Sequence, residues 1–212
     1  LITLDNKNKD FFFFEKKDVR SVMGALVYLV KTRLPEYIGA SPFEIQVLTP
    51  MRKGELGVEH LNEVLQYYLN PASESKKEKE GRTGVFREGD KVMQVKNNYK
   101  LEWKITNAKG FSIEEGLGVF NGDMGIIKQI NTYSERITVV FDENREAEYP
   151  FSSLDELELA YAITIHKSQG SEYPAVVLPL LSGPPILCNR NLLYTAITRA
   201  QKCVAIAGRQ SM

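Results

Sequence analysis

Residues 160–172, AYAITIHKSQGSE, decide the fold of this chain. In the first half, small or polar residues alternate with the bulkier Tyr161, Ile163 and Ile165, a pattern that predicts a β-strand. The second half is a run of short polar residues in which Gly170 allows a tight turn or close approach of the backbone to a ligand. Open α/β sheets bind ligands outside the carboxyl ends of their strands. The stretch therefore predicts an α/β fold with a polar ligand-binding loop; the alternative is an ordinary buried strand followed by a solvated turn.

Three segments in a fixed order carry a family resemblance. Residues 45–62 (IQVLTPMRKGELGVEHLN), 164–177 (TIHKSQGSEYPAVV) and 192–202 (LLYTAITRAQK) are similar to the motif IV region, motif V and motif VI of one helicase family. The chain thus resembles the C-terminal portion of the RecD-like superfamily 1 DNA helicases, the exodeoxyribonuclease V alpha subunit family. The resemblance implies an α/β fold: a RecA-like parallel-sheet domain, the second motor domain, with an inserted small antiparallel β-barrel of Src-homology type.

Composition sets outer limits on the protein class. At 212 residues and 43% hydrophobic content, the chain suits one large domain, or one domain carrying a smaller inserted domain. Lysine plus arginine and aspartate plus glutamate number 27 each, so any basic surface must be local. Cys188 and Cys203 show no pairing pattern and fit buried thiols in a reducing cytoplasm. We see no apolar run of membrane-spanning length and no signal peptide, and the first residue, Leu1, suggests a fragment of a longer protein.

The predicted α/β domain comprises residues 1–84 and 156–212. Residues 11–14 are all phenylalanine, as expected of a strand buried on both faces, and Asp18 can cap the helix that follows. We expect Pro35 to end this helix, and residues 45–48 to form the next strand, paired in parallel with the first. The remaining expected elements are a helix ending at Pro71, a mobile connection over 71–84, a strand at 175–180, a Pro-rich loop at 182–185, a helix at 189–199 and a strand at 203–207.

Residues 85–155 have the short-strand periodicity and turn residues of a small antiparallel barrel. The predicted strands cover residues 91–95, 125–130, 136–141 and 146–151. Residues 137–143 (ITVVFDE) imitate the magnesium-binding Walker B motif, but we interpret their Asp-Glu-Asn continuation as a hairpin turn.

Four residues are candidates for nucleotide contact, by resemblance. Arg199 would act as the arginine finger, because a planar guanidinium suits the charge that develops on a transferred phosphoryl group. Arg52 would be a second phosphate-facing cation, although the adjacent Lys53 could take that role. Gly170 and Glu172 would lie at the nucleotide, with the carboxylate accepting hydrogen bonds from the ribose. The competing interpretations are an exposed cation at a helix end for Arg199 and a solvated carboxylate for Glu172.

Single-stranded DNA is the predicted partner of a second set. Hydroxyl and imidazole groups can donate to phosphates without reading the bases, which a translocating motor requires. The candidates on the α/β domain are Thr49, Thr164, His166, Lys167, Ser168 and Gln169, although His166 could instead be structural. In the barrel, Asn97, Asn98 and Tyr99 resemble a strand-tracking segment that the family places close to residues 119–123. Extra residues, about 102–118, separate the two here, and a solvated hairpin edge is the alternative.

The sequence contains no P-loop, because neither Lys31-Thr32 nor Lys167-Ser168 follows a Gly-rich turn. We therefore expect ATP and Mg²⁺ to be held mainly by an N-terminal RecA-like domain of the same protein, and this chain alone to be inactive. The two histidines, His60 and His166, make no credible metal site.

The predicted function is that of the C-terminal motor portion of an ATP-dependent DNA helicase in recombination or repair. It would translocate on single-stranded DNA and unwind duplex, with 5′-to-3′ travel implied by the resemblance alone, and other repair proteins are possible partners. Two alternatives stay open: a non-catalytic nucleic-acid-binding module, and the helicase part of a conjugative relaxase.

Overall fold

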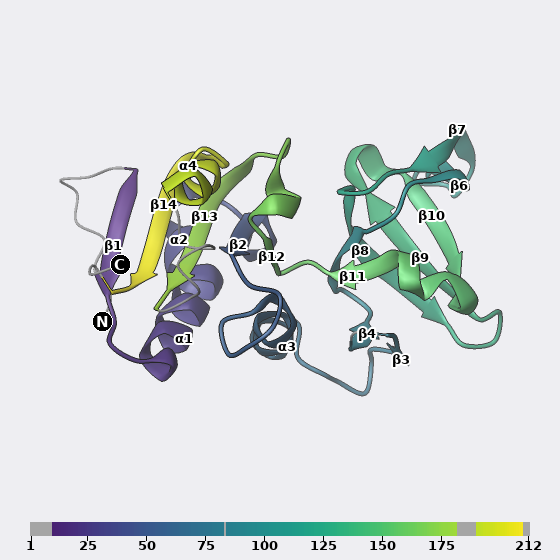
Figure 1. Cartoon of the computed structure of the whole chain (residues 1–212). Coiled ribbons are helices and arrows are strands. Elements are labelled where there is room, and N and C mark those ends of the chain that lie inside the picture. Colours follow the sequence, from purple (N-terminus) through teal and green to yellow (C-terminus); the bar gives the residue numbers. More distant parts are fainter. Residues whose placement is uncertain (1–9, 83, 182–189, 210–212) are drawn as a thin grey trace. The chain divides into compact units, whose positions relative to one another are not determined.

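The computed structural model of the chain describes residues 10–82, 84–181 and 190–209. The chain divides into two compact units, residues 1–69 with 161–212, and residues 70–160, so that the second interrupts the first (Figure 1). The predicted fold class, a RecA-like parallel-sheet domain with an inserted antiparallel barrel, is confirmed. The insert takes in more chain than the predicted 85–155, because short strands just outside these limits pair with its own strands.

A five-stranded parallel sheet forms the centre of the first unit. Its order is β1-β14-β13-β2-β12, and every neighbouring pair is parallel. The strands span Phe11–Glu15 (β1), Ile45–Thr49 (β2), Ala162–Thr164 (β12), Tyr173–Leu180 (β13) and Ala200–Gly208 (β14). The expected direct pairing of the first two strands is wrong, because β14 and β13 lie between them. The expectation for residues 182–185 lies outside the described residues.

Helices cover both faces of this sheet. In Figure 1, α4 (Arg190–Ile197) lies on the opposite side of the sheet from α1 (Val19–Tyr28) and α3 (Val58–Leu69). Right-handed crossovers explain the arrangement, since the chain moves one way across the sheet through α1 and α3 and the other way through α4. The central strands are consequently buried on both faces, with Val47, Val176 and Val177 fully enclosed.

The first helix begins as predicted but does not end at Pro35. Asp18 is its N-cap and accepts a hydrogen bond from the backbone of Ser21 at 2.8 Å. Beyond α1 the backbone continues through a π-helical segment (Leu29–Arg33) into α2 (Leu34–Ile38), where Pro35 occupies the first turn. A proline is tolerated there because its missing N–H would have had no helical partner. Gly39, with φ of 66°, ends the helix instead.

The phenylalanine strand β1 is an edge strand rather than one buried on both faces. Phe12 is 5% exposed, whereas Phe11 and Phe13 on the other face are 38% and 37% exposed. Among the described strands β1 pairs only with β14, so the alternation of a half-covered strand replaces the predicted uniform burial.

The insert is a seven-stranded antiparallel sheet in the order β11-β5-β8-β9-β10-β6-β7. Buried aliphatic residues and the fully buried Tyr149 form its core, and Tyr149 donates to Gln94 Oε1 at 2.9 Å. A 3₁₀ turn, Asp142–Asn144, connects β9 to β10, so the Walker B imitation is a hairpin turn as interpreted. The strands span Lys91–Gln94 (β5), Asn98–Thr106 (β6), Ser112–Val119 (β7), Met124–Asn131 (β8), Arg136–Phe141 (β9), Glu146–Pro150 (β10) and Leu157–Leu159 (β11).

The segment expected to be a mobile connection, 71–84, contains a strand. Glu78–Glu80 (β3) pairs in antiparallel fashion with Val85–Arg87 (β4). The guanidinium of Arg87, on the second strand, forms an ion pair with Glu78 at 2.6 Å. A polar composition does not prevent pairing when the partner strand supplies both backbone bonds and a charge.

The extra residues of the barrel form the long hairpin β6–β7. Trp103 lies opposite Gly116 in this hairpin, and a Cβ atom on Gly116 would come within 2.3 Å of the indole. The glycine thus leaves room for the indole beside the neighbouring strand, and the Arg145 guanidinium lies over the ring at 5.6 Å from its centroid.

Candidate nucleotide and DNA interface

The carboxyl ends of β2 and β12 bring two predicted segments together. Thr49 and Thr164 are aligned in the parallel register, and both strands end there. The Arg52 loop follows β2, and the turn containing His166 follows β12. The backbone N–H of Ile165 donates to Thr49 O at 3.1 Å, which fixes the second turn to the first strand.

Four of the predicted DNA contacts have accessible side chains at this end. His166 and Gln169 are exposed, whereas Thr164 and Lys167 are half-buried. The Thr164 hydroxyl accepts a hydrogen bond from the Lys167 backbone at 3.3 Å, which leaves its own proton free to donate outward. We call Arg52, Thr164, His166, Lys167 and Gln169 the carboxyl-end cluster.

Two other predicted DNA contacts, Thr49 and Ser168, are fully buried, which corrects the expectation that they face the strand. Thr49 Oγ1 donates to the Leu56 carbonyl at 2.7 Å and accepts from the Met51 backbone, and so shapes the Arg52 loop. Ser168 Oγ donates to Ile165 O at 2.7 Å inside the 3₁₀ turn. Both hydroxyls are used by the fold, because a buried polar group requires a partner.

The amino ends of β13 and β14 carry Glu172 and Arg199. The guanidinium of Arg199 donates to Ser171 O from Nη1 and to Thr195 O from Nε, each at 3.3 Å. Among the described residues no carboxylate forms an ion pair with Arg199. Glu172 is exposed and accepts from Gln201 Nε2 at 3.3 Å. Because this half-buried guanidinium makes long hydrogen bonds to neutral oxygens, its positive charge is available to bind an anion.

Tyr173 is joined to Arg199 through its backbone. Its backbone N–H donates to Arg199 O at 2.8 Å, and its side chain is only 7% exposed. Burial raises the pKa of the Tyr173 phenol, and its hydroxyl lacks a hydrogen-bond partner among the described residues. We call Glu172, Tyr173 and Arg199 the amino-end cluster.

Arg199 and Arg52 lie next to opposite ends of their strands, since Arg199 immediately precedes β14 and Arg52 follows β2. Ala175 is in register with Ile45, and Tyr173 is in register with Ala200, so Arg199 precedes the level at which β2 begins. Arg52 lies beyond the carboxyl end of β2. The strand levels between them correspond to about 20 Å of backbone at about 3.3 Å per residue.

In the insert, the β6–β7 hairpin brings residues 97–99 next to residues 119–121, although the extra residues 102–118 separate them in the sequence. Asn98 is in register with Val119, and the Asn121 backbone donates to Asn97 Oδ1 at 2.9 Å. The rings of Tyr99 and Phe120 meet edge to face at 5.5 Å and are 68% and 41% exposed. The Asn98 amide is half-buried and donates to Glu156, so its part is structural.

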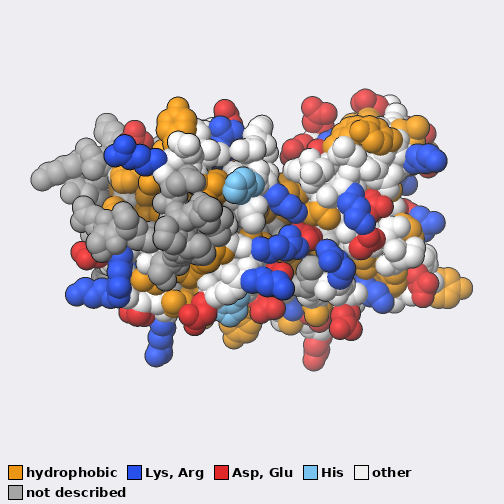
Figure 2. Space-filling view, in the orientation of Figure 1, with side chains coloured by type: hydrophobic (Ala, Val, Ile, Leu, Met, Phe, Trp, Pro, Cys, Tyr) orange, Lys and Arg blue, Asp and Glu red, His pale blue; other side chains and the backbone are white. Residues whose placement is uncertain are grey.

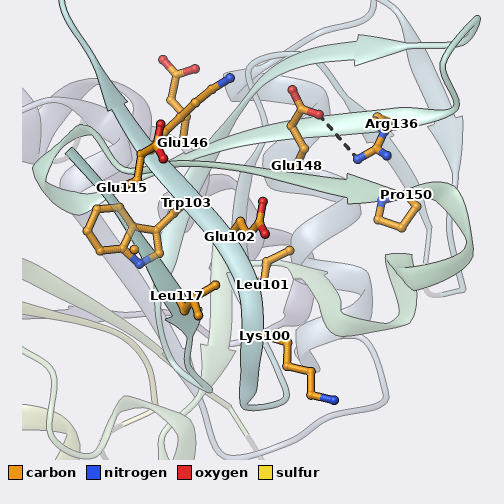
Figure 3. A pocket seen from close by; sticks show the side chains of 12 residues that line it. Lys100, Leu101, Glu102, Trp103, Glu115, Leu117, Arg136, Glu146, Glu148 and Pro150 are labelled. Carbon is orange, nitrogen blue, oxygen red and sulfur yellow. Dashed lines mark ion pairs between the residues drawn. The ribbon is translucent and has the colours of Figure 1, made fainter. Parts of the chain in front are cut away.

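A cavity of about 680 Å³ lies beside this hairpin, on the outer face of β6, β7, β9 and β10 (Figure 3). Its walls include the charged residues Glu102, Glu115, Glu146, Glu148, Lys100, Lys104 and Arg136. Arg136 and Glu148 already pair with each other at 3.5 Å. Four carboxylates against three cations disfavour a phosphodiester chain, so we do not place the DNA strand there.

Basic and acidic side chains lie side by side over the face shown in Figure 2. In the part of the chain that the structure describes, no three metal-ligating side chains gather together, and no helix is long and apolar enough to cross a membrane. Burial raises the pKa of the Cys203 thiol to about 11, as expected of a core cysteine.

Family models match both units. Residues 61–141 match the ATP-dependent RecD-like DNA helicase SH3 domain, and residues 159–207 match the UvrD-like helicase C-terminal domain. The chain is 39% identical, over 80% of its length, to the ATP-dependent RecD2 DNA helicase of Deinococcus radiodurans. The chain belongs to the RecD-like helicases. It spans only 21% of the length of that relative.

A second RecD-like relative and one solved structure are also similar to the chain. The chain is 30% identical, over 79% of its length, to the RecBCD enzyme subunit RecD of Mycolicibacterium smegmatis, of which it covers 26%. A solved structure of Bacteroides Pif1 bound to single-stranded DNA shows a more distant likeness, with 15% identity and a TM-score of 0.48 over 91% of this chain and 49% of that one.

Two residues of this RecD-like chain were missed by sequence reasoning. Asn62 is 5% exposed and makes two side-chain bonds to the backbone of Ala162, and Tyr173 underlies Arg199. A buried asparagine on the apolar face of a helix was the available signal for the first. No sequence signal distinguishes Tyr173 from an ordinary strand residue.

Proposed function

We propose that this chain is the second RecA-like domain of an ATP-dependent DNA helicase, with its SH3-type barrel inserted. In the whole protein, ATP and its Mg²⁺ would be held mainly by an N-terminal RecA-like domain, and hydrolysis would drive travel along single-stranded DNA. Unwinding of duplex, 5′-to-3′ polarity and a part in recombination or repair follow from the family resemblance.

The observation that carries this proposal is the separation of the two clusters at opposite ends of one sheet. The carboxyl-end cluster offers hydroxyl, imidazole and amide groups, and the amino-end cluster offers a guanidinium without a carboxylate partner among the described residues. Residues 165–172 connect them directly, since they leave β12 at one end and enter β13 at the other. A change at one end therefore has a short covalent route to the other.

At the amino end, Arg199 would meet the γ-phosphate of a nucleotide bound by the other domain. Its present acceptors, Ser171 O and Thr195 O, are neutral and 3.3 Å away, so a phosphate oxygen would compete well for the guanidinium. Glu172, exposed beside it, would accept hydrogen bonds from the ribose, and Gly170 would let the backbone approach the nucleotide.

In the barrel, the exposed ring of Tyr99 and its neighbour Phe120 would provide a stacking surface for bases. The Asn97 side chain is exposed nearby and holds the Phe120–Asn121 turn through its oxygen. Stacking on aromatic rings tolerates every base, which suits a motor that moves along any sequence.

The test is Arg199→Ala in the full-length protein. We expect DNA-stimulated ATP hydrolysis to fall by about 10³-fold or more, the range of arginine-finger losses, with single-strand affinity largely kept. Arg199→Lys should rescue little, because a lysine lacks the planar fork.

Arg209→Ala is the matched control. The Arg209 guanidinium also donates to a backbone carbonyl, that of Lys17 at 2.7 Å, but lies at the far end of β14. ATP turnover that survives Arg199→Ala would refute the finger role. A wild-type protein that binds DNA but hydrolyses no ATP would favour the non-catalytic module.

A further inference from the structure

A chain of side-chain hydrogen bonds runs from the core of the insert to the segment that carries Tyr99. The buried phenol of Tyr149 donates to Gln94 Oε1 at 2.9 Å, and Gln94 Nε2 donates to Glu156 Oε2 at 3.0 Å. The same carboxylate oxygen accepts from Asn98 Nδ2 at 3.0 Å. Burial raises the pKa of the Tyr149 phenol, so the phenol keeps its proton and acts as the donor. Glu156 therefore links the buried core to Asn98, the first residue of β6.

The carboxylate of Glu156 decides how both amides are oriented. An ionised carboxylate can only accept hydrogen bonds, so Gln94 and Asn98 must both turn their NH₂ groups toward it. Their oxygens are then left for other donors: the oxygen of Gln94 accepts from Tyr149, and that of Asn98 accepts from the Lys100 backbone at 3.1 Å. An amide turned the other way would place its oxygen against the carboxylate, which is unfavourable.

The orientation of Asn98 fixes the backbone around Tyr99. Asn98 Oδ1 holds the N–H of Lys100, so this bond closes a short turn in which Tyr99 is the middle residue. The Tyr99 ring is exposed, and few contacts other than this turn can hold it in one place. Its position therefore depends on Glu156 through Asn98.

The neighbouring ring of Phe120 is held independently of Glu156. The Phe120 N–H donates to Asp123 Oδ2 at 3.0 Å, and the Asn121 N–H donates to Asn97 Oδ1 at 2.9 Å. Loss of the Glu156 carboxylate would leave these two bonds intact. We therefore expect such a loss to release Tyr99 while Phe120 stays in place.

We propose that Glu156 is the positioning residue of the stacking surface in the barrel, and that it acts through Asn98 to hold the Tyr99 ring against Phe120. The inference rests on the proposed function, because it takes Tyr99 and Phe120 as the surface on which bases stack. A ring that is already fixed loses less conformational freedom when the strand binds, so the same contact gives a higher affinity. Glu156 itself makes no contact with the strand, since a carboxylate would repel its phosphates.

The experiment measures the affinity of the full-length protein for an oligothymidylate, without nucleotide and over a range of salt concentrations. Tyr99→Ala should weaken binding about tenfold, the worth of one stacked base. Glu156→Ala should weaken binding about fivefold, within the range for the loss of one preorganised side chain. The double variant should bind no worse than Tyr99→Ala alone, because both changes remove the same contact. The slope of log Kd against log salt should stay at its wild-type value, since stacking neutralises no phosphate.

Glu88→Ala is the matched control. Glu88 is also a half-buried residue of the insert, and its carboxylate also holds two N–H groups, those of Lys77 at 3.1 Å and Ile130 at 2.8 Å. This variant should lower the urea midpoint about as much as Glu156→Ala and leave strand affinity within about twofold of wild type. Combined with Tyr99→Ala, its effect on affinity should simply multiply.

Glu156→Gln separates hydrogen bonding from charge. Its amide oxygen can still accept from Gln94 and Asn98, so affinity should return to within about threefold of wild type. Asn98→Ala provides a second variant should Glu156→Ala fail to fold, because it breaks the same connection at the half-buried end of β6. It should also weaken binding about fivefold, with no further loss when Tyr99→Ala is added.

The outcomes separate this inference from the proposed function. A wild-type protein without affinity for the oligomer would refute both. If Tyr99→Ala binds as tightly as wild type, the stacking surface itself is wrong. If Tyr99→Ala loses affinity but Glu156→Ala keeps it, or if the two losses multiply, only the role of Glu156 fails. Equal losses in Glu156→Gln and Glu156→Ala, or a changed salt slope, would mean that Glu156 acts through its charge and would also overturn the positioning role.

Discussion

Gly170 is the point in the 165–172 connection where a single methyl group should be most informative. Its φ is +86°, in the region that side chains other than glycine rarely adopt, yet a Cβ atom there would meet no atom within 4 Å. Gly170→Ala therefore introduces backbone strain without a steric clash. The left-handed conformation costs an alanine about 1–2 kcal/mol, which the loop can avoid only by changing its path.

A changed path of the 165–172 loop would disturb the connection between the carboxyl-end and amino-end clusters. We expect Gly170→Ala to lower the maximal DNA-stimulated ATPase rate by about fivefold to thirtyfold, the factor that corresponds to about 1–2 kcal/mol. Gly170→Asn should lose less, because asparagine tolerates this conformation better. The assay is steady-state ATP turnover at saturating single-stranded DNA, with urea denaturation run on the same proteins.

Gly110 in the β6–β7 turn is the matched control. It has a φ of +81° and also nothing within 4 Å of its Cβ position, but it lies in the insert, outside both clusters. Gly110→Ala should lose comparable stability and keep its ATPase rate. Equal ATPase losses in the two variants, or none in Gly170→Ala, would refute the reasoning that this loop conformation serves the site.

Two predictions concern packing rather than chemistry. Gly116→Ala should destabilise the insert by about 1–3 kcal/mol through overpacking, because its Cβ would lie 2.3 Å from the Trp103 ring; the shift of the tryptophan-fluorescence midpoint in urea measures this, and an unchanged midpoint contradicts the packing. Cys203, in a Cys188→Ser background, should react with a thiol reagent at pH 8 only as fast as the fold opens, since its pKa of about 11 leaves about 0.1% thiolate; rapid labelling in native buffer would show that the thiol is accessible.

Much of the α/β fold follows from hydrophobic pattern alone. The strands at residues 11–14, 45–48, 175–180 and 203–207 were predicted close to their observed bounds, because parallel strands buried by helices are continuous apolar runs. Pro35 was misjudged because a π-helical segment places it in a new first turn, and that local change has no sequence signature.

The β6–β7 hairpin could have been predicted from the sequence. Tyr99, Leu101, Trp103 and Ile105 alternate with polar residues, and Asn107 begins a turn that ends at Gly110. Extra residues relative to a family were interpreted as an interruption, whereas the alternation predicts a paired ribbon.

The candidate site was only partly predictable, because a motif names residues but not the end of the sheet on which they lie. Arg52 and Arg199 were grouped by chemistry, and the strand register shows that they lie next to opposite ends of their strands. Thr49 and Ser168 were chosen for their hydroxyls, and only burial shows that the fold uses both internally. Exposure and register are tertiary properties, so the sequence supplied the candidates but not their assignment.

The separation of the two ends is tested most directly by measuring both ligands on two variants of the full-length protein. Thr164→Val should weaken single-strand affinity about tenfold, the worth of a hydrogen bond to a charged group, and leave the KM for ATP near its wild-type value. Arg199→Ala should leave strand affinity near wild type and nearly abolish ATP turnover. If the two variants lose both properties in equal measure, the clusters do not serve different ligands and the account is wrong.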